Sequence, residues 1–146
     1  MGSQQSAGRK HGWRSGLEEA VASILSEQGV DFGYEVAPIP FTEPAKKRRY
    51  TPDFWLPNGI IIETKGRFVT ADRAKMKLIK EQYPDLDIRF VFSNAGARIS
   101  KRSRTTYARW CEAHGFPWAH RMVPEAWLKE RGTAKAKRAM KEITDA

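Results

Sequence analysis

The spacing of apolar residues predicts an amphipathic helix near the start of the chain. These residues recur at intervals of three and four, the period of one helical face, and they are Leu17, Val21, Ile24 and Leu25. Ser15 precedes the run and Glu18 comes three residues after it, a pattern typical of an N-terminal capping box. We therefore expect a helix that begins after Ser15 and ends near Gly29, where glycine favours a helix C-terminus.

Strand patterns follow this helix. Residues 30–36 alternate between apolar and polar positions, which predicts a first strand. Residues 60–62 are consecutive isoleucines, β-branched and too few for a helix, and they predict a buried strand. Asn58-Gly59 stands directly before them and is typical of a two-residue hairpin turn, because both residues tolerate a positive φ. Such a turn brings Asp53 back toward Glu63.

The second half of the chain predicts a strand–helix–strand unit. Residues 71–83 predict a basic helix that Pro84 stops, with Met76 and Ile79 spaced as its buried edge. Residues 87–93 predict a strand buried on both faces. A helical crossover between two strands implies that the strands are parallel and that the core is α/β. The remaining predicted elements are a loop at 94–104 and short helices at 105–114 and 124–128.

Prolines dominate the stretch 38–44. Proline fixes φ and lacks an N–H donor, so this stretch should be extended and stiff and is neither a helix nor a central strand. At about 3.1 Å per residue, residues 36–48 could span on the order of 35 Å. The segment is either a long ordered surface loop or a rigid bridge that carries the first helix and strand away from the rest of their own chain.

Length and charge limit the function classes. The chain has 146 residues, the size of one domain. Lys and Arg number 26 against 17 Asp and Glu, a formal net charge of +9, which favours nucleic acid or, alternatively, an anionic membrane as partner. No apolar run approaches the roughly 18 residues of a membrane span. Cys111 is the single cysteine, so we expect no intramolecular disulfide and a reducing, cytoplasmic location without a membrane partner.

Acidic and basic residues gather where the predicted hairpin closes. Glu63 and Lys65 are two apart on a strand and so leave the same face, near Asp53. Mg²⁺ prefers carboxylate oxygens, water and phosphate as ligands, and a bound ion lowers the pKa of water and polarises a phosphoryl oxygen. A nearby lysine can orient or deprotonate that water or offset charge on the phosphorane. The pattern favours phosphodiester hydrolysis over an ordinary hairpin with a surface Glu/Lys pair.

The same residues resemble a known family. Pro52-Asp53 followed by Glu63-Thr64-Lys65 resembles the PD-(D/E)xK nuclease signature. Longer segments resemble the endonuclease I family of the T-odd bacteriophages, whose members are Holliday-junction resolvases. These segments are 14–18, 50–54, 56–60, 63–66, 84–89 and 91–93, and the similarity extends from about residue 14 to residue 129.

The resemblance implies an α/β fold with a mixed central β-sheet flanked by helices, in a domain-swapped homodimer joined through residues 36–48. It implies Mg²⁺ as cofactor, one or two ions per site, with Mn²⁺ as a substitute. Asp53, Glu63 and Glu18 are the implied metal-site residues, with Glu18 supplied by the partner chain; spacing alone leaves Glu18 open between capping and catalysis. Thr64 is expected to point into the core from the opposite face, with its backbone carbonyl as a further candidate ligand. The candidate catalytic residues are Glu18, Asp53, Glu63 and Lys65.

Basic residues near these carboxylates or in loops are the candidate DNA contacts. Four cations at 46–49 stand a few residues before Asp53, and the loop 94–104 is rich in arginine. Such side chains contact phosphates regardless of sequence, although a solvated surface is the simpler alternative for each. The candidates are Arg14, Lys46, Lys47, Arg48, Arg49, Arg67, Lys75, Arg98, Lys101, Arg102 and Arg104.

The resulting hypothesis is a magnesium-dependent endonuclease that resolves four-way and other branched double-stranded DNA, in the bacterial host cytoplasm if a phage encodes it. We expect a flexible tail at 1–13, a nuclease domain at 14–130 and a basic tail at 131–146 that is frayed or becomes helical on DNA. The alternatives are another PD-(D/E)xK nuclease, of the restriction, repair or transposase-nicking type, and a DNA-binding protein that does no chemistry.

Overall fold

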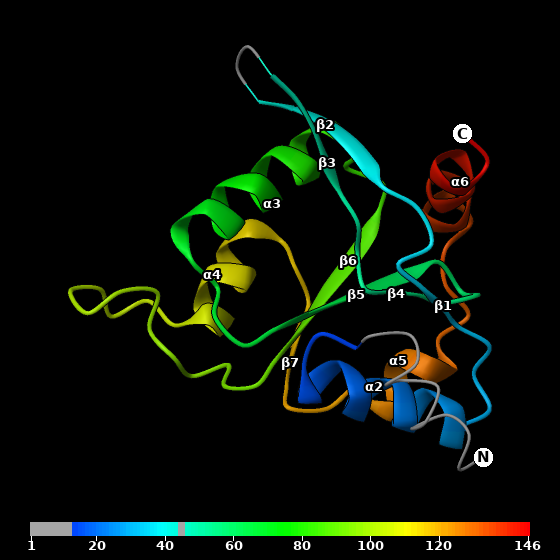
Figure 1. Ribbon diagram of the computed structural model, residues 1–146, viewed down its shortest axis with the longest axis horizontal. Coiled ribbons are helices and arrows are strands. Elements are labelled where there is room, and N and C mark those ends of the chain that lie inside the picture. Colours follow the sequence, from blue (N-terminus) through cyan, green and yellow to red (C-terminus); the bar gives the residue numbers. More distant parts are fainter. Residues whose placement is uncertain (1–12, 44–45) are drawn as a thin grey trace.

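The computed structural model describes residues 13–43 and 46–146, which form a central five-stranded sheet flanked by helices and a separate two-stranded hairpin (Figure 1). This confirms the predicted mixed α/β fold. The helices are α2 (Gly16–Glu27), α3 (Thr70–Gln82), α4 (Tyr107–His114), α5 (Glu125–Lys129) and α6 (Ala134–Thr144). The strands are β1 (Gly33–Tyr34), β2 (Ile39–Glu43), β3 (Lys46–Tyr50), β4 (Phe54–Trp55), β5 (Ile60–Lys65), β6 (Asp87–Phe92) and β7 (Trp118–His120).

The central sheet has the strand order β1-β4-β5-β6-β7. Strands β1, β4 and β5 are antiparallel neighbours, whereas β5, β6 and β7 are parallel. The predicted hairpin before residue 60 and the predicted parallel crossover through α3 are both confirmed. Of the strand expected over 30–36 only β1 forms, because Glu35 takes a positive φ of 46° and turns the backbone.

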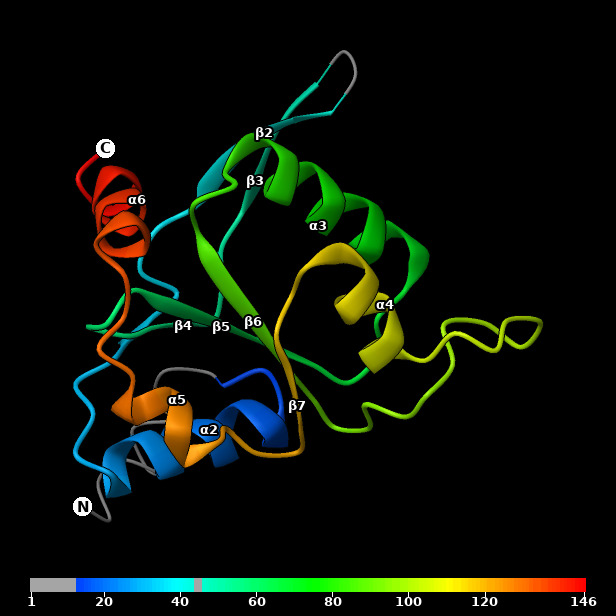
Figure 2. The same ribbon diagram turned by 180° about the vertical axis from the view of Figure 1, so that it is seen from behind.

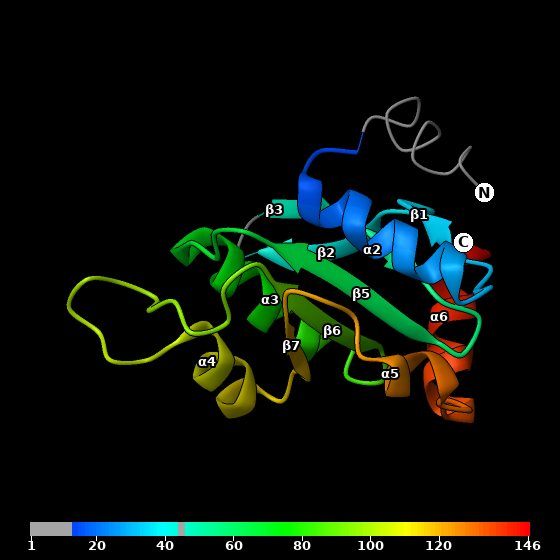
Figure 3. The same cartoon turned by 90° about the horizontal axis from the view of Figure 1, so that it is seen from below.

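Apolar side chains cover both faces of the sheet. Helices α2 and α5 lie on one side and α3 and α4 on the other (Figures 1 and 2). Strand β5 alternates between the two, since Ile61 packs with the α3 and α4 cluster while Ile60 and Ile62 pack with the α2 and α5 cluster. Figure 3 shows α2 lying along β5. Helix α2 therefore presents its N-terminal turn to the last residues of β5.

The proline-rich stretch forms a hairpin within the chain. Residues 39–43 are extended, as predicted, but they pair antiparallel with residues 46–50 and do not run on as one long bridge. Ile39 and Phe41 are buried while Pro40 and Thr42 face outward, and an edge position accepts a proline that has no N–H to donate. Residues 36–48 therefore differ from the single extended segment that the prolines predicted. Residues 44 and 45 lie outside the described part of the chain.

The C-terminal stretch forms the helix α6, which differs from the tail expected at 131–146 that is frayed or becomes helical on DNA. Thr133 caps α6 by accepting a hydrogen bond from the N–H of Ala136 at 3.0 Å. Apolar residues at helical spacing attach this helix to the core: Ala136 and Ile143 are buried, and Ala139 and Met140 pack beside them. The tail expected at 1–13 lies outside the described residues except for Trp13, which packs edge-on against Tyr34 with ring centroids 4.1 Å apart.

Candidate active site

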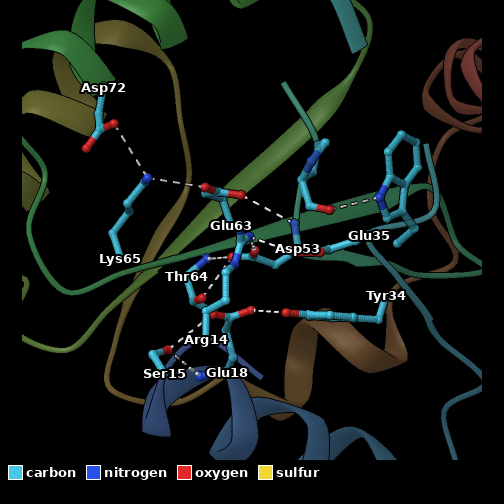
Figure 4. Close-up of polar contacts among 12 residues, drawn as sticks. Arg14, Ser15, Glu18, Tyr34, Glu35, Asp53, Glu63, Thr64, Lys65 and Asp72 are labelled. Carbon is cyan, nitrogen blue, oxygen red and sulfur yellow. Dashed lines mark hydrogen bonds and ion pairs between the residues drawn. The ribbon is translucent and has the colours of Figure 1, made fainter. Parts of the chain in front are cut away.

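Hairpin closure places Asp53 beside the end of β5 (Figure 4). Phe54 pairs with Ile62, and the N–H of Asp53 donates to Glu63 Oε1 at 3.3 Å. Asp53 is only 3% exposed. Its Oδ2 accepts hydrogen bonds from the backbone N–H of Thr64 at 2.9 Å and from the Thr64 hydroxyl at 2.8 Å. Thr64 is buried, but its hydroxyl contacts the Asp53 carboxylate, whereas the sequence pattern predicted a side chain directed into the core.

Glu18 joins this site from the first turn of α2. Ser15 caps α2 as predicted, since its hydroxyl accepts the N–H of Glu18 at 3.1 Å. The Glu18 carboxylate accepts a hydrogen bond from the Tyr34 hydroxyl and is 4% exposed. Burial raises the pKa of Glu18, the Tyr34 hydrogen bond opposes that rise, and the Asp53 charge adds to it. The helix cap and the site therefore use different groups of the same turn.

Among these carboxyl groups, Glu63 has the most strongly raised pKa. It is 5% exposed, and burial together with the Asp53 charge raises its pKa to about 8, although Lys65 counteracts the rise. Lys65 Nζ lies 3.4 Å from Glu63 Oε2 and 3.7 Å from Asp72 Oδ1. The predicted set of Asp53, Glu63, Lys65 and Glu18 is thus brought together within one chain. Burial is thus the main reason why the Glu18 and Glu63 carboxyl groups have raised pKa values, and the Asp53 charge adds to the effect.

Glu35 is a further acidic group that sequence reasoning missed. Oxygens of Glu18, Glu35 and Asp53 all lie within 4.8 Å of one another, close enough to hold one metal ion. The backbone N–H of Glu35 donates to the carbonyl of Asp53 at 2.9 Å. Glu35 has a positive φ that departs from the strand pattern, and no local sequence signal marks that conformation.

The predicted DNA contacts do not all lie at the carboxylates. Arg14 Nη2 reaches Glu35 at 2.7 Å and Asp53 at 3.2 Å, and its side chain is 64% exposed. Lys75 Nζ lies 4.9 Å from the centre of the Tyr50 ring, on the α3 side of the site. The other candidates are exposed on β3, after β5 and in the loop 94–104, which extends beyond α4 (Figure 1). Those residues are Lys46, Lys47, Arg48, Arg49, Arg67, Arg98, Lys101, Arg102 and Arg104.

Comparisons with known proteins identify relatives over most of this chain. The family model described as phage endonuclease I matches residues 1–145. Endonuclease I of Escherichia phage T7 is 48% identical over 118 residues, covering 81% of this chain and 79% of the relative. Endodeoxyribonuclease 1 of Enterobacteria phage T3 is 49% identical over 118 residues, covering 81% of this chain and 78% of the relative.

Proposed function

Because the chain belongs to the phage endonuclease I family, we propose that it is a metal-dependent DNA endonuclease that cuts branched double-stranded DNA, four-way junctions in particular. The observation that carries the proposal is the buried cluster of Glu18, Asp53 and Glu63 with Lys65 at its edge. Burying several carboxylates together is costly, and a divalent cation would add to the compensation that Arg14 gives Asp53 and Lys65 gives Glu63. A formal net charge of +9 supports DNA as the substrate.

The donor set fits Mg²⁺, with Mn²⁺ as a substitute and one or two ions per site. Hard divalent cations take carboxylate oxygens, carbonyl oxygens and water. The residues that would hold the ions are Glu18, Glu35 and Asp53, whose carboxylate oxygens lie close together, with Glu63 and the carbonyl of Thr64 as further donors. A divalent ion supplies polarisation of the phosphoryl oxygen and a bound water of lowered pKa.

The protein's own side chains would orient the carboxylates and the attacking water and offset the negative charge of the reaction. The Thr64 hydroxyl and N–H fix Asp53, while the Tyr34 hydroxyl fixes Glu18. Lys65 orients the attacking water or offsets the negative charge that grows on the phosphorus oxygens. The water oxygen bonds to phosphorus as the bond to the 3′ oxygen breaks. The water loses one proton and the 3′ oxygen gains one, which leaves 5′-phosphate and 3′-hydroxyl ends. The order Asp53, Glu63, Lys65 around a β-hairpin supports placement in the PD-(D/E)xK superfamily.

The dimer that we propose forms by exchange across the β2–β3 hairpin. If the hairpin opens between Glu43 and Lys46, residues before it can make the same contacts with a partner chain that they make within their own chain. Glu18 of one chain would then complete the site of Asp53 and Glu63 in the other. Mixing Glu18→Ala chains with Asp53→Ala chains under refolding tests this, because one intact site forms only in an exchanged heterodimer. Activity no higher than that of either variant alone would argue against exchange.

The basic residues would select DNA by shape and charge. Exposed cations on β3 and in the loop 94–104 contact phosphates without reading bases. Each phosphate contact adds about −0.9 to the slope of log affinity against log salt, so binding should weaken steeply with salt.

No helix among the described residues is long and apolar enough to cross a membrane. The phage origin of the relatives supports action in the host cytoplasm.

Cleavage of a labelled four-way junction beside a linear duplex of matching sequence tests the function. The reactions contain Mg²⁺ or EDTA, with wild type and Asp53→Asn, which keeps an oxygen for the Thr64 donors. Metal-dependent cuts near the branch that are lost in the variant, while junction binding persists, are the expected result. Equal cutting of the linear duplex would indicate another kind of nuclease, and tight binding without cutting in any metal would leave a DNA-binding protein.

A further inference from the structure

Lys65 lies between two carboxylates, and only one of them belongs to the cluster around Asp53 (Figure 4). Its Nζ is 3.4 Å from Glu63 Oε2 and 3.7 Å from Asp72 Oδ1. The side chains of Lys65 and Asp72 are 18% and 22% exposed. Asp72 belongs to the first turn of α3, an element that contributes none of the proposed metal ligands. The lysine is thus linked to a part of the fold outside the carboxylate cluster.

The Asp72 carboxylate is itself held in place. Its second oxygen, Oδ2, accepts the backbone N–H of Val69 at 3.3 Å. Val69 stands at the N-cap of α3 and has no polar side chain with which to cap the helix, so Asp72 satisfies a backbone donor at this end. The partial positive charge of a helix N-terminus favours an anion there. One carboxylate oxygen is therefore fixed by the backbone while the other faces Lys65.

We propose that Asp72 is a positioning residue for Lys65 in the cleavage reaction, an inference that rests on the proposed function. A lysine ammonium sits on a flexible stem and has several donors to place. With Glu63 as its single partner, the ammonium would compete with a divalent ion for oxygens of the same carboxylate. Asp72 offers a second anion on the other side of the ammonium. Lys65 then stays beside Glu63 and remains directed at the reacting phosphate.

Three variants separate this role from that of a helix cap. Asp72→Asn keeps an oxygen for the Val69 N–H and removes the charge, whereas Asp72→Glu keeps the charge. Asp85→Asn is the matched control, because Asp85 and Lys135 form an exposed pair with the same 3.7 Å separation. For each protein, kcat and KM for junction cleavage, the melting temperature, and the acylation rate of the Lys65 amine by an amine-reactive ester are measured, the last by mass spectrometry without DNA.

Asp72→Asn should lower kcat by about 10- to 100-fold, as removal of a group that orients a metal-site residue does, with KM and melting temperature unchanged. Asp72→Glu should recover most of kcat, and Asp85→Asn should behave as wild type. Lys65 should be acylated faster in Asp72→Asn, since its amine has lost one carboxylate partner.

Other outcomes would overturn the inference. A wild-type kcat in Asp72→Asn would do so, as would a loss of kcat that follows the melting temperature and is not recovered in Asp72→Glu, because that pattern is a lost helix cap. A wild-type protein that cuts no junction would remove the proposed function instead. The acylation measurement does not depend on activity, and an unchanged Lys65 rate in Asp72→Asn would end the inference by itself.

Discussion

Replacing Glu63 with glutamine should remove most of the loss of stability that the metal-free protein undergoes as the pH rises. Burial and the Asp53 charge raise the pKa of Glu63 from 4.5 to about 8. A carboxyl group whose pKa is raised by folding binds its proton more tightly in the folded chain than in the unfolded chain. Its contribution to stability is therefore complete below the ordinary pKa and declines as the pH rises toward 8.

The interval between the two pKa values sets the size of the effect. Stability changes by about 1.4 kcal/mol for each pH unit between them, so a lone group shifted from 4.5 to about 8 would lose on the order of 5 kcal/mol. Asp53 shares the repulsion, so we expect a measured loss on the order of 2–5 kcal/mol. This is a large part of the roughly 5–15 kcal/mol that stabilises a typical domain.

Urea unfolding in EDTA, followed by tryptophan fluorescence from about pH 5 to about pH 8.5, measures the loss. The free energy of unfolding should fall with pH in wild type and fall much less in Glu63→Gln, where the raised pKa of Glu18 leaves a smaller dependence. Glu81→Gln, at an exposed position of α3, should follow wild type. Excess Mg²⁺ should reduce the fall in wild type, because a metal ion binds the deprotonated carboxylate. Parallel curves for wild type and Glu63→Gln would refute the reasoning.

Three further predictions concern the elements around the site. Ser15→Ala removes the α2 cap and should lower the free energy of unfolding by about 1 kcal/mol in urea titrations; an unchanged value would mean that the cap is not needed. Asn58→Ala removes hydrogen bonds of 3.0 Å to the carbonyls of Trp127 and Glu130. It should lower the free energy of unfolding by about 1–3 kcal/mol and speed proteolysis before α6. Equal proteolysis of variant and wild type would mean that Asn58 does not hold this segment in place. Arg102→Ala should reduce the salt slope of junction binding by about 0.9 without changing kcat at saturating DNA; an unchanged slope would remove it from the interface.

The sequence alone was sufficient for the elements whose signals are local. The isoleucines at 60–62 after Asn58-Gly59 predicted the β4–β5 hairpin, and with it the meeting of Asp53 and Glu63, because turn chemistry and β-branching act over a few residues. Residue spacing alone did not decide whether Glu18 caps the helix or belongs to the active site. The resemblance to the family added Glu18 to the predicted site. Apolar residues at helical spacing are also present at 136–143. The many Ala and Lys residues there nevertheless led to the prediction of a tail and not of a packed helix.

The tertiary structure alone decided which side chains complete the site. Glu35 reaches Asp53 through a backbone conformation that no local pattern marks. The contacts of Tyr34 with Glu18 and of Asp72 with Lys65 join elements that are distant in the sequence or separated by a turn. The return of residues 39–43 onto 46–50 likewise depends on burying Ile39 and Phe41 against the core. These features follow from the packing of whole elements, where burial and distance, and not sequence spacing, determine which charges meet.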